Sequence, residues 1–238
     1  ALYSTLKEFT QTNLIETIRE SGLKGRGGEG FPTANKWQIV KDTASSDKFI
    51  ICNAHESDPS SYVDRFIVEN MPFKVIEGIA LASYACGASR AFVFMNRENR
   101  HSIEVLSSAI DKATQAGCIG DNIFNSGFSL KIQIFEAPGA LICGEETALI
   151  SCIEGGRATP RIRPPYPATN GLWGKPTAVN NVETLVCASN IVFEKVVNSN
   201  NSQFKDVCQT KMVCLSGEIV NKGIAEVKLG TDFKDLIF

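Results

Sequence analysis

The chain has 238 residues, of which 43% are hydrophobic and 21% charged, and its net charge is −2. This composition is typical of a globular protein and argues against a disordered chain. Its 24 Lys and Arg residues against 26 Asp and Glu residues argue against a nucleic-acid-binding protein, which would usually be basic. No apolar run approaches the ~20 residues of a membrane-spanning helix, and no signal peptide is recognisable, so we predict neither direct membrane insertion nor export.

The eight cysteines are spaced too widely for a familiar cluster-binding motif. None forms a C-x-x-C pair, and most lie in apolar runs. We therefore expect reduced thiols in a reducing compartment, and neither a disulfide framework nor a complete iron–sulfur site within this chain. His55 and His101 are the only histidines, which argues against a metal site.

Predicted helices and strands alternate along most of the chain. Helical spacing of apolar residues predicts helices at residues 14–23 (capped by Thr12 or Asn13), 36–41, 66–87, 103–117, 144–154 and 180–197. Short apolar runs predict strands at residues 49–52, 91–94 and 130–134. This alternation implies right-handed crossovers and an α/β fold, a parallel sheet with helices on both faces. Such sheets bind ligands beyond the carboxyl ends of their strands, where residues 53–58 must lie.

The pattern changes after a polar stretch at residues 198–202. Residues 212–217 and 225–229 predict a β-hairpin, and a helix is expected to begin at Asp232. About thirty residues cannot bury a core of their own, so we expect an incomplete second domain at residues 201–238, after an α/β domain at residues 1–200.

A glycine-rich loop follows the first predicted helix. Gly25, Gly27 and Gly30 match G-x-G-x-x-G, but a helix precedes the loop where the dinucleotide-binding motif requires a strand. With Gly28, the loop has four glycines that allow close approach of a flat or phosphorylated ligand. Phe31 is expected either to stack on an aromatic ring of that ligand or to belong to the core.

Two further segments each have a structural and a functional interpretation. Asn53 to Asp58 are placed either to hydrogen-bond a ligand or to cap the next helix. Glu145 and Glu146 begin a predicted helix, where they either complement the helix dipole or form a carboxylate pair with raised pKa. Sequence spacing does not choose between these alternatives.

Two polar segments near residue 170 are also candidates for ligand binding. Arg157, Arg161, Arg163, Tyr166 and Lys175 lie among prolines, where rigid cationic loops suit phosphate binding, although a solvated basic surface has the same composition. The pair Asn180 and Asn181 fits a helix cap, and tandem amides also suit hydrogen bonding to a heterocycle.

Together these segments resemble one family, the FMN- and NADH-binding flavoprotein subunit of respiratory complex I, which is shared with NAD-linked hydrogenases and formate dehydrogenases. The resemblance runs in order through essentially the whole chain. Its matching segments are Gly22 to Lys36-Trp37, Cys52 to Asp64-Arg65, Ile142 to Glu154-Gly155, Pro160 to Ala168, and Gly174 to Leu185.

The resemblance implies an FMN/NADH-binding α/β domain at residues 1–200 followed by the start of a β-grasp (ubiquitin-like) domain at residues 201–238. In the family a helical bundle with a 4Fe–4S cluster comes next. We expect that cluster here only if further C-terminal sequence exists.

The resemblance also implies roles for individual residues. Those implied to contact FMN are Gly25, Arg26, Gly27, Lys36, Asn53, Glu56, Gly144, Glu145, Asn180, Asn181 and Thr184, with Gly28, Gly30 and His55 also expected to line the cofactor site. Phe31 and Tyr166 would flank the adenine of NADH. Asp58, Glu146 and Arg163 would hold its polar groups, with Glu146 positioning the nicotinamide. No protein side chain is required as a nucleophile or general base.

The activity that the resemblance implies is that of an NADH dehydrogenase. FMN would accept hydride from NADH and pass electrons singly to iron–sulfur clusters of a larger complex. The expected partners are NADH, a thioredoxin-like 2Fe–2S subunit and other iron–sulfur subunits. The expected location is peripheral, on the matrix side of the mitochondrial inner membrane or in a related organelle, or alternatively in the bacterial cytoplasm.

The chain departs from the family pattern at several positions near the expected nucleotide site. Glu29 replaces a small residue, Ile39 an aromatic residue, His55 an aspartate and Leu141 a tyrosine. These departures leave an alternative open, a divergent non-catalytic paralogue that is kept for assembly, with or without bound FMN, and that has lost NADH oxidation.

Overall fold

A four-stranded parallel sheet forms the centre of the molecule. The computed structural model describes residues 1–197, 207 and 209–238. The strands are ordered β3-β2-β1-β4, and each neighbouring pair is parallel. Their bounds are β1 Phe49–Ala54, β2 Arg90–Asn96, β3 Lys131–Ala137 and β4 Thr177–Asn181. The predicted α/β class with a parallel sheet is therefore confirmed.

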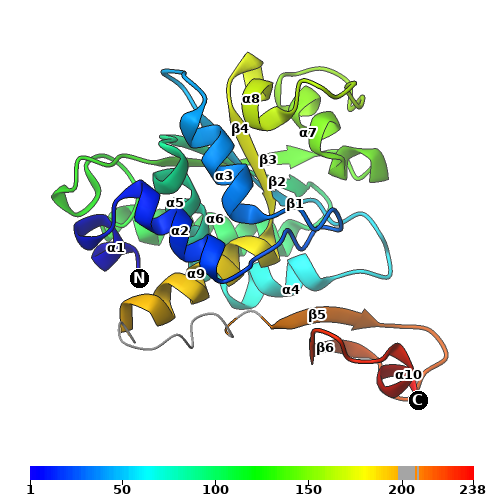
Figure 1. Cartoon of the computed structure of the whole chain (residues 1–238). Coiled ribbons are helices and arrows are strands. Elements are labelled where there is room, and N and C mark those ends of the chain that lie inside the picture. The colour runs from blue at the N-terminus through cyan, green and yellow to red at the C-terminus, as the bar shows by residue number, and fades with distance from the viewer. Residues whose placement is uncertain (198–206, 208) are drawn as a thin grey trace.

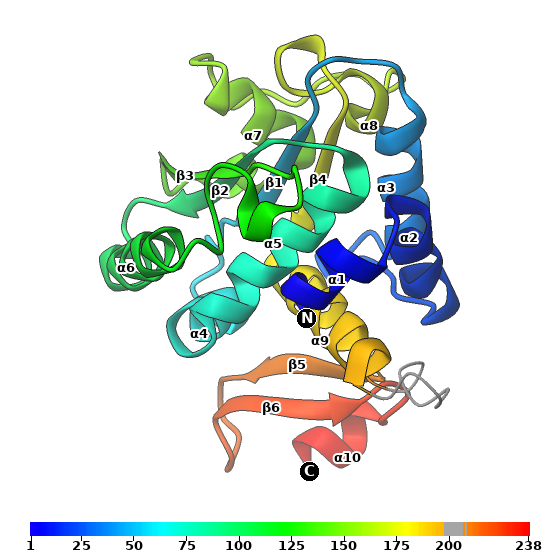
Figure 2. The same cartoon turned by 90° about the vertical axis from the view of Figure 1, so that its left-hand side faces the viewer.

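Helices cover both faces of this sheet (Figures 1 and 2). One face packs mainly on α5 and α9, with α2, α3 and α6 around them, and the other face packs on α7. The α-helices are α1 Leu2–Glu8, α2 Gln11–Glu20, α3 Thr33–Asp42, α4 Val63–Asn70, α5 Pro72–Cys86, α6 Arg100–Gln115, α7 Glu146–Ile153, α8 Pro167–Asn170, α9 Val182–Val197 and α10 Phe233–Ile237. Short 3-10 turns lie at η1 Ile123–Asn125, η2 Leu141–Gly144 and η3 Leu172–Gly174.

Strands β1 and β2 are apolar over most of their length because both of their faces are buried. Along β1, Ile50 and Cys52 belong to the core beneath α5 and α9, whereas Phe49 and Ile51 belong to the core beneath α7. Side chains of a strand alternate between faces, so a sheet covered on both sides needs apolar residues at every position. This two-sided burial explains the short apolar runs that predicted β1 and β2 in the sequence.

Several predicted boundaries were wrong. The predicted helix at residues 66–87 is two helices, α4 and α5, which meet at Met71 where Pro72 begins the second one. The cap of α2 is Thr10, whose side chain accepts a hydrogen bond from the Asn13 amide. Helix α1 and strand β4 were not predicted. Asn180 and Asn181 are the last residues of β4. The cap interpretation still holds for Asn181, which directly precedes α9 and whose Oδ1 accepts from the Glu183 amide at 2.9 Å.

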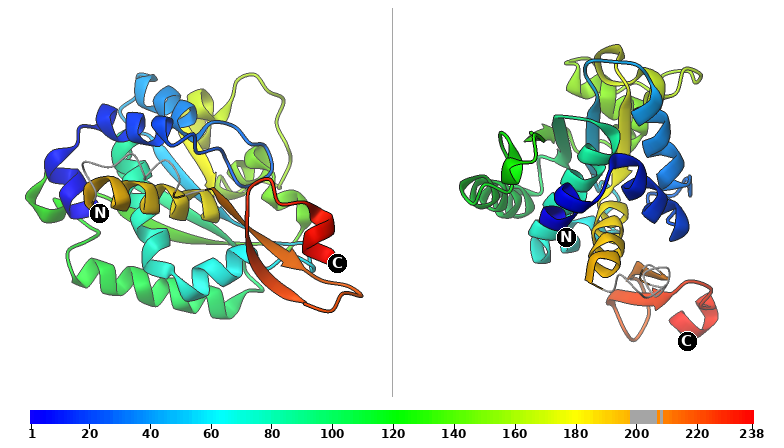
Figure 3. Two further views of the ribbon diagram at one scale, coloured as in Figure 1. Left: turned by 60° about the horizontal axis from the view of Figure 1, so that its bottom comes forward. Right: turned by 60° about the vertical axis from the view of Figure 1, so that its left-hand side comes forward.

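An antiparallel hairpin lies beside the main body, below α4 and α9 in Figures 1 and 2 and at the edge of the molecule in both views of Figure 3. It consists of β5 Thr210–Leu215 and β6 Gly223–Lys228, followed by α10, as the sequence pattern predicted. Its assignment to a β-grasp domain stays a prediction, as does the proposed boundary at residue 200. The predicted polar linker at residues 198–202 lies outside the described residues.

Two observations bear on cysteine chemistry and on membranes. Among the described residues, no two cysteines form a disulfide, and Cys52, Cys86, Cys143 and Cys152 are buried. In the same part of the chain, none of the helices combines the length and the hydropathy that a bilayer crossing requires.

Helices α5 and α9 pack so closely that one glycine is required between them. A Cβ atom added to Gly78 of α5 would lie 2.3 Å from the carbonyl oxygen of Leu185 in α9.

We expect Gly78→Ala to lower the free energy of unfolding by about 2 kcal/mol or more, because the helix backbones must separate. Urea unfolding measures this loss. Gly25→Ala is the control, since its Cβ would meet the Phe31 carbonyl oxygen at an ordinary 3.6 Å. Equal stability of the two variants would contradict the prediction.

Candidate functional site

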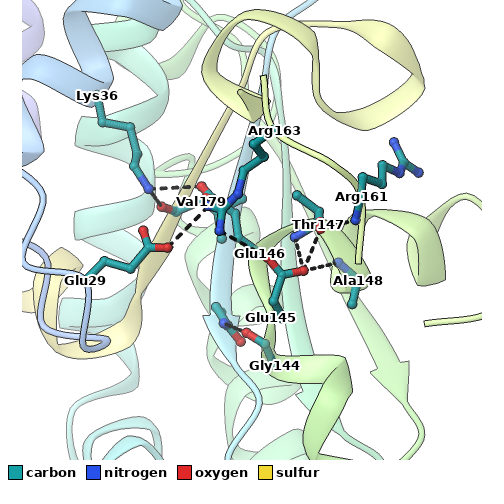
Figure 4. A network of polar contacts seen from close by, with 11 residues as sticks. Glu29, Lys36, Gly144, Glu145, Glu146, Thr147, Ala148, Arg161, Arg163 and Val179 are labelled. Carbon is teal, nitrogen blue, oxygen red and sulfur yellow. Dashed lines mark hydrogen bonds and ion pairs between the residues drawn. The ribbon is translucent and has the colours of Figure 1, made fainter. Parts of the chain in front are cut away.

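Polar residues from six parts of the fold line one pocket at the carboxyl end of the sheet. Strands β1 and β4 are paired so that Asn53 lies opposite Asn181. The glycine loop, α3, the start of α7 and the Arg/Pro-rich segment complete the walls (Figure 4). The lining residues are Gly25, Gly27, Glu29, Phe31, Thr33, Lys36, Asn53, Gly144, Glu145, Glu146, Arg163, Val179, Asn180 and Asn181. Eleven of these fourteen residues were predicted as site residues. The other three are Glu29, Thr33 and Val179.

A second hollow adjoins the first and contains other predicted residues. Its walls include Arg26, His55, Glu56 and Asp58 together with residues of the hairpin. The two hollows have volumes of about 230 and about 670 Å³. They share the lining residues Gly27, Asn53, Gly144 and Asn181, so they form one continuous cleft.

The glycine loop is held against the start of α9. The Arg26 amide donates to Thr184 Oγ1 at 2.9 Å, and the Gly25 amide donates to the Phe31 carbonyl at 2.9 Å. A Cβ on Gly27 would lie 3.3 Å from the Cβ of Asn181, which is tighter than most Cβ contacts. The loop backbone therefore reaches the end of β4, and Gly27 keeps the cleft open there.

Three asparagines at the strand ends have fixed orientations. Asn53 Nδ2 donates to the Gly144 carbonyl at 2.9 Å, and Asn180 Oδ1 accepts from the buried Trp37 Nε1 at 3.0 Å. Asn181 Oδ1 accepts from the Glu183 amide at 2.9 Å. These bonds preorganise the amides that face the pocket.

Charged side chains form a network across the pocket (Figure 4). Arg163 Nη1 lies 3.3 Å from Glu29 Oε1 and 3.3 Å from Glu146 Oε2, and its Nη2 lies 3.8 Å from Glu145 Oε1. Lys36 Nζ lies 3.0 Å from Glu146 Oε1 and also donates to the Val179 carbonyl. The hydrogen bond from Arg163 to Glu29 raises the pKa of Arg163, and the charges of Glu29, Glu146 and Glu145 add to this effect.

The two glutamates have different roles in the fold. Glu145 is the N-cap of α7, since its Oε2 accepts from the amides of Thr147 and Ala148 at 2.9 and 2.8 Å. The structural interpretation of Glu145 is therefore confirmed. Glu146 is directed instead at Lys36 and Arg163.

The segment after β1 also contains a structural carboxylate. Glu56 accepts hydrogen bonds from the amides of Asp64 and Arg65, both at 3.1 Å, so it caps α4 as the structural interpretation predicted. His55 is buried, its Nε2 lies 3.0 Å from the Ala140 carbonyl, and burial lowers its pKa. Asp58 is exposed, and its hydrogen bonds from Ser60 lower its pKa.

Four predicted residues do not line either hollow. Gly28 and Gly30 belong to the outer part of the glycine loop, where both have positive φ angles. Tyr166 precedes α8 with an exposed ring, and Thr184 is buried beneath the loop.

Sequence reasoning missed several residues of the cleft, among them Thr33, Val179 and Asp64. Thr33 and Val179 line the pocket, but a single threonine and a strand valine carry no distinctive signal. Among the described residues, the buried Thr33 Oγ1 has no hydrogen-bond partner. Asp64 lines the second hollow, and its oxygens accept from Asn181 Nδ2 at 3.0 and 2.8 Å. Within the part of the chain that the structure describes, no group of three or more His, Cys, Asp and Glu side chains could hold a metal ion.

Asp64 lies in an acidic environment behind the pocket. Burial raises its pKa to about 7, and the charges of Glu56 and Glu183 contribute. The hydrogen bond from Asn181 and the charge of Lys211 act in the opposite direction. Asp64 therefore changes its ionisation near neutral pH, directly behind an amide that faces the pocket.

We expect Asp64 to make the protein less stable as pH rises. The folded chain keeps the Asp64 proton up to about pH 7, whereas the unfolded chain releases it near 3.8. The free energy of unfolding therefore falls between these values, by at most about 1.4 kcal/mol per pH unit for one group. Asp64→Asn cannot ionise, so it should flatten this decline in urea unfolding across the same pH range. Asp111→Asn, an exposed change on α6, is the control; identical slopes for Asp64→Asn and the parent would disprove the assignment.

A parallel sheet whose carboxyl edge forms a polar cleft under a glycine loop defines an α/β nucleotide-binding protein. Residues 18–190 match the Nuo51 FMN-binding domain. The chain belongs to this family.

Relatives and solved structures agree with this assignment. The F subunit of NADH-quinone oxidoreductase from Buchnera aphidicola subsp. Schizaphis graminum is 43% identical over 100% of this chain and 54% of the relative. The F subunit of the Escherichia coli NADH-quinone oxidoreductase is 41% identical over 98% of this chain and 52% of the relative. The NAD⁺-reducing [NiFe]-hydrogenase in its H₂-reduced state has a TM-score of 0.86 at 32% identity, and the match covers 99% of this chain and 40% of that one. The chain thus spans about half the length of the curated relatives it matches.

Proposed function

We propose that this chain is the FMN- and NADH-binding part of an NADH dehydrogenase flavoprotein. The observation that carries the proposal is the convergence of Gly27, Asn53, Gly144 and Asn181 on one cleft at the carboxyl edge of the sheet. The family match and the NADH-quinone oxidoreductase relatives support the same function.

The residues present fit a flavin nucleotide. Gly27 keeps open a space that a Cβ would narrow, and the buried Thr33 hydroxyl has no hydrogen-bond partner in the described part of the chain. The combined hollow falls in the range of about 300–1,000 Å³ that is usual for ligand sites. Amides, backbone groups and the Lys36 ammonium offer donors and acceptors for a heterocycle and a phosphate.

The residues proposed to hold FMN line the first hollow, line the adjoining second hollow or support the walls of the cleft. They are Gly25, Arg26, Gly27, Gly28, Gly30, Lys36, Asn53, His55, Glu56, Gly144, Glu145, Asn180, Asn181 and Thr184. When bound, FMN supplies hydride acceptance and release of electrons one at a time. The chain contributes fixed side-chain amides, backbone that can approach the ligand closely and a cation, all of which would bind FMN and orient it. Glu56, Glu145 and Thr184 act through the elements that they anchor.

The NADH site is proposed to lie at the exposed rim of the cleft. Phe31 and Tyr166 present exposed rings, 42% and 59% accessible, that are suited to flank an adenine. Arg163 suits a phosphate, Glu146 would position the nicotinamide, and Asp58 offers an exposed carboxylate to polar groups.

The partners and the location are proposed from the relatives. The NADH-quinone oxidoreductase relatives and the hydrogenases are parts of multi-subunit enzymes, so we propose assembly with iron–sulfur subunits, including a thioredoxin-like 2Fe–2S subunit. A peripheral position in a mitochondrion, a related organelle or a bacterial cytoplasm is proposed for that assembly.

Lys36 provides a direct test of FMN binding. Loss of one charged hydrogen bond should raise the FMN dissociation constant of Lys36→Gln by about tenfold or more. Quenching of flavin fluorescence on titration measures this constant. Lys41→Gln is the matched control, since Lys41 lies on the same helix and its Nζ donates to Thr12 Oγ1. Equal constants for both variants would place FMN away from Lys36.

The NADH step is tested on FMN-loaded protein without oxygen. We expect NADH to bleach the oxidised-flavin absorbance, because the cleft is proposed to place both nucleotides together. Flavin that stays bound and unbleached would favour the non-catalytic paralogue. Bleaching seen only after Glu29→Ala and His55→Asp are combined would show that the native chain has lost the activity.

A further inference from the structure

Glu29 binds the arginine that is proposed to meet a dinucleotide phosphate. Its Oε1 accepts from Arg163 Nη1 at 3.3 Å, although the two residues are 134 positions apart in the sequence. The bond joins the glycine loop to the Arg/Pro-rich segment across the pocket (Figure 4). Both residues line that pocket.

Glu29 differs from the other two carboxylates around Arg163. Glu145 is fixed by the helix amides that it caps, and Glu146 is fixed by Lys36. Within the described part of the chain, the polar contact of Glu29 is the one to Arg163. The Glu29 side chain is 58% exposed, against 29% and 13% for Glu145 and Glu146. Of the three, Glu29 has the least to hold it in place.

Glu29 is flanked by two glycines that have open space around them. Gly28 has a φ of +113° and Gly30 a φ of +64°, and a Cβ on either glycine would meet nothing within 4 Å. Glycine accepts both positive and negative φ, so the backbone can reorient and carry Glu29 away from the pocket.

The charge of the pocket is unfavourable for an anionic ligand. Glu29, Glu145 and Glu146 face Lys36 and Arg163, so the charged side chains around Arg163 sum to one negative charge. Arg163 is a planar donor suited to phosphate oxygens, but it is already bound to carboxylates. Removing Glu29 from the network would make this sum zero.

We propose that Glu29 is an internal competitor for Arg163, which a pyrophosphate-bearing nucleotide must displace in order to bind. Glu29 thereby weakens the binding of such nucleotides. The inference rests on the proposed function, because it takes the dinucleotide to bind in this cleft. It concerns a residue at which this chain differs from the pattern of the family that it resembles.

The test compares ADP-ribose, which carries the pyrophosphate, with adenosine, which does not. Binding of each is measured by calorimetry to FMN-loaded protein at low salt. Glu29→Gln removes the charge and keeps the size, and it should bind ADP-ribose about three- to fivefold more tightly, as expected for loss of a partly exposed charge contact. The gain should shrink as salt is added. Adenosine binding should not change.

Two further variants isolate the competition. Glu16→Gln, an exposed glutamate paired with Arg19 on α2, should bind both ligands like the parent. In an Arg163→Gln background, Glu29→Gln should give no gain, because the contested donor is gone. A full gain in that background would show general repulsion in place of competition for Arg163, and the proposal would be rejected.

The outcomes separate this proposal from the proposed function. Equal ADP-ribose affinity of Glu29→Gln and the parent overturns the role of Glu29 while leaving the nucleotide site in place. An equal gain for adenosine overturns it too, since a packing effect would then explain the change. If no variant binds ADP-ribose, the proposed NADH site and the role of Glu29 both fail.

Discussion

The parallel pairing of β1 with β4 is the constraint on which the rest of the site depends. It sets Asn53 opposite Asn181, so two strand ends more than a hundred residues apart in sequence deliver their amides to one edge. The glycine loop reaches this edge because Gly27 has no side chain to hold it off Asn181. Backbone hydrogen bonding between two buried strands thereby fixes the floor of the cleft, while the loops above supply its charges.

Strand β1 shows why the central sheet was predictable, and β4 shows the limit. Phe49 to Cys52 form an unbroken apolar run, which both faces of the sheet require. In β4, Thr177 to Asn181 mix polar and apolar residues and run directly into α9, so the sequence resembles a capped helix start. The strand exists because its neighbour β1 satisfies its backbone, which is a long-range effect that no local pattern contains.

The same limit applies to the site. Resemblance selected residues that converge in space, yet it did not separate ligand-facing groups from groups that support the fold. Glu56 and Glu145 both use their carboxylates on helix amides, a structural role that the sequence offered beside ligand binding without deciding between the two. Thr33 and Asp64 were missed because only their surroundings distinguish them. The Thr33 hydroxyl is buried without a hydrogen-bond partner among the described residues, and burial raises the pKa of Asp64.

Lys211 of β5 ties the hairpin to the wall of the cleft. Its ammonium group donates to the carbonyl of Arg26 at 3.1 Å and pairs with Glu183, which also accepts from the Met212 amide. One side chain therefore pins the glycine loop to a separate layer of the molecule. A shift of the hairpin would therefore also displace the backbone beside Gly27, which couples the position of the C-terminal strands to the width of the cleft entrance.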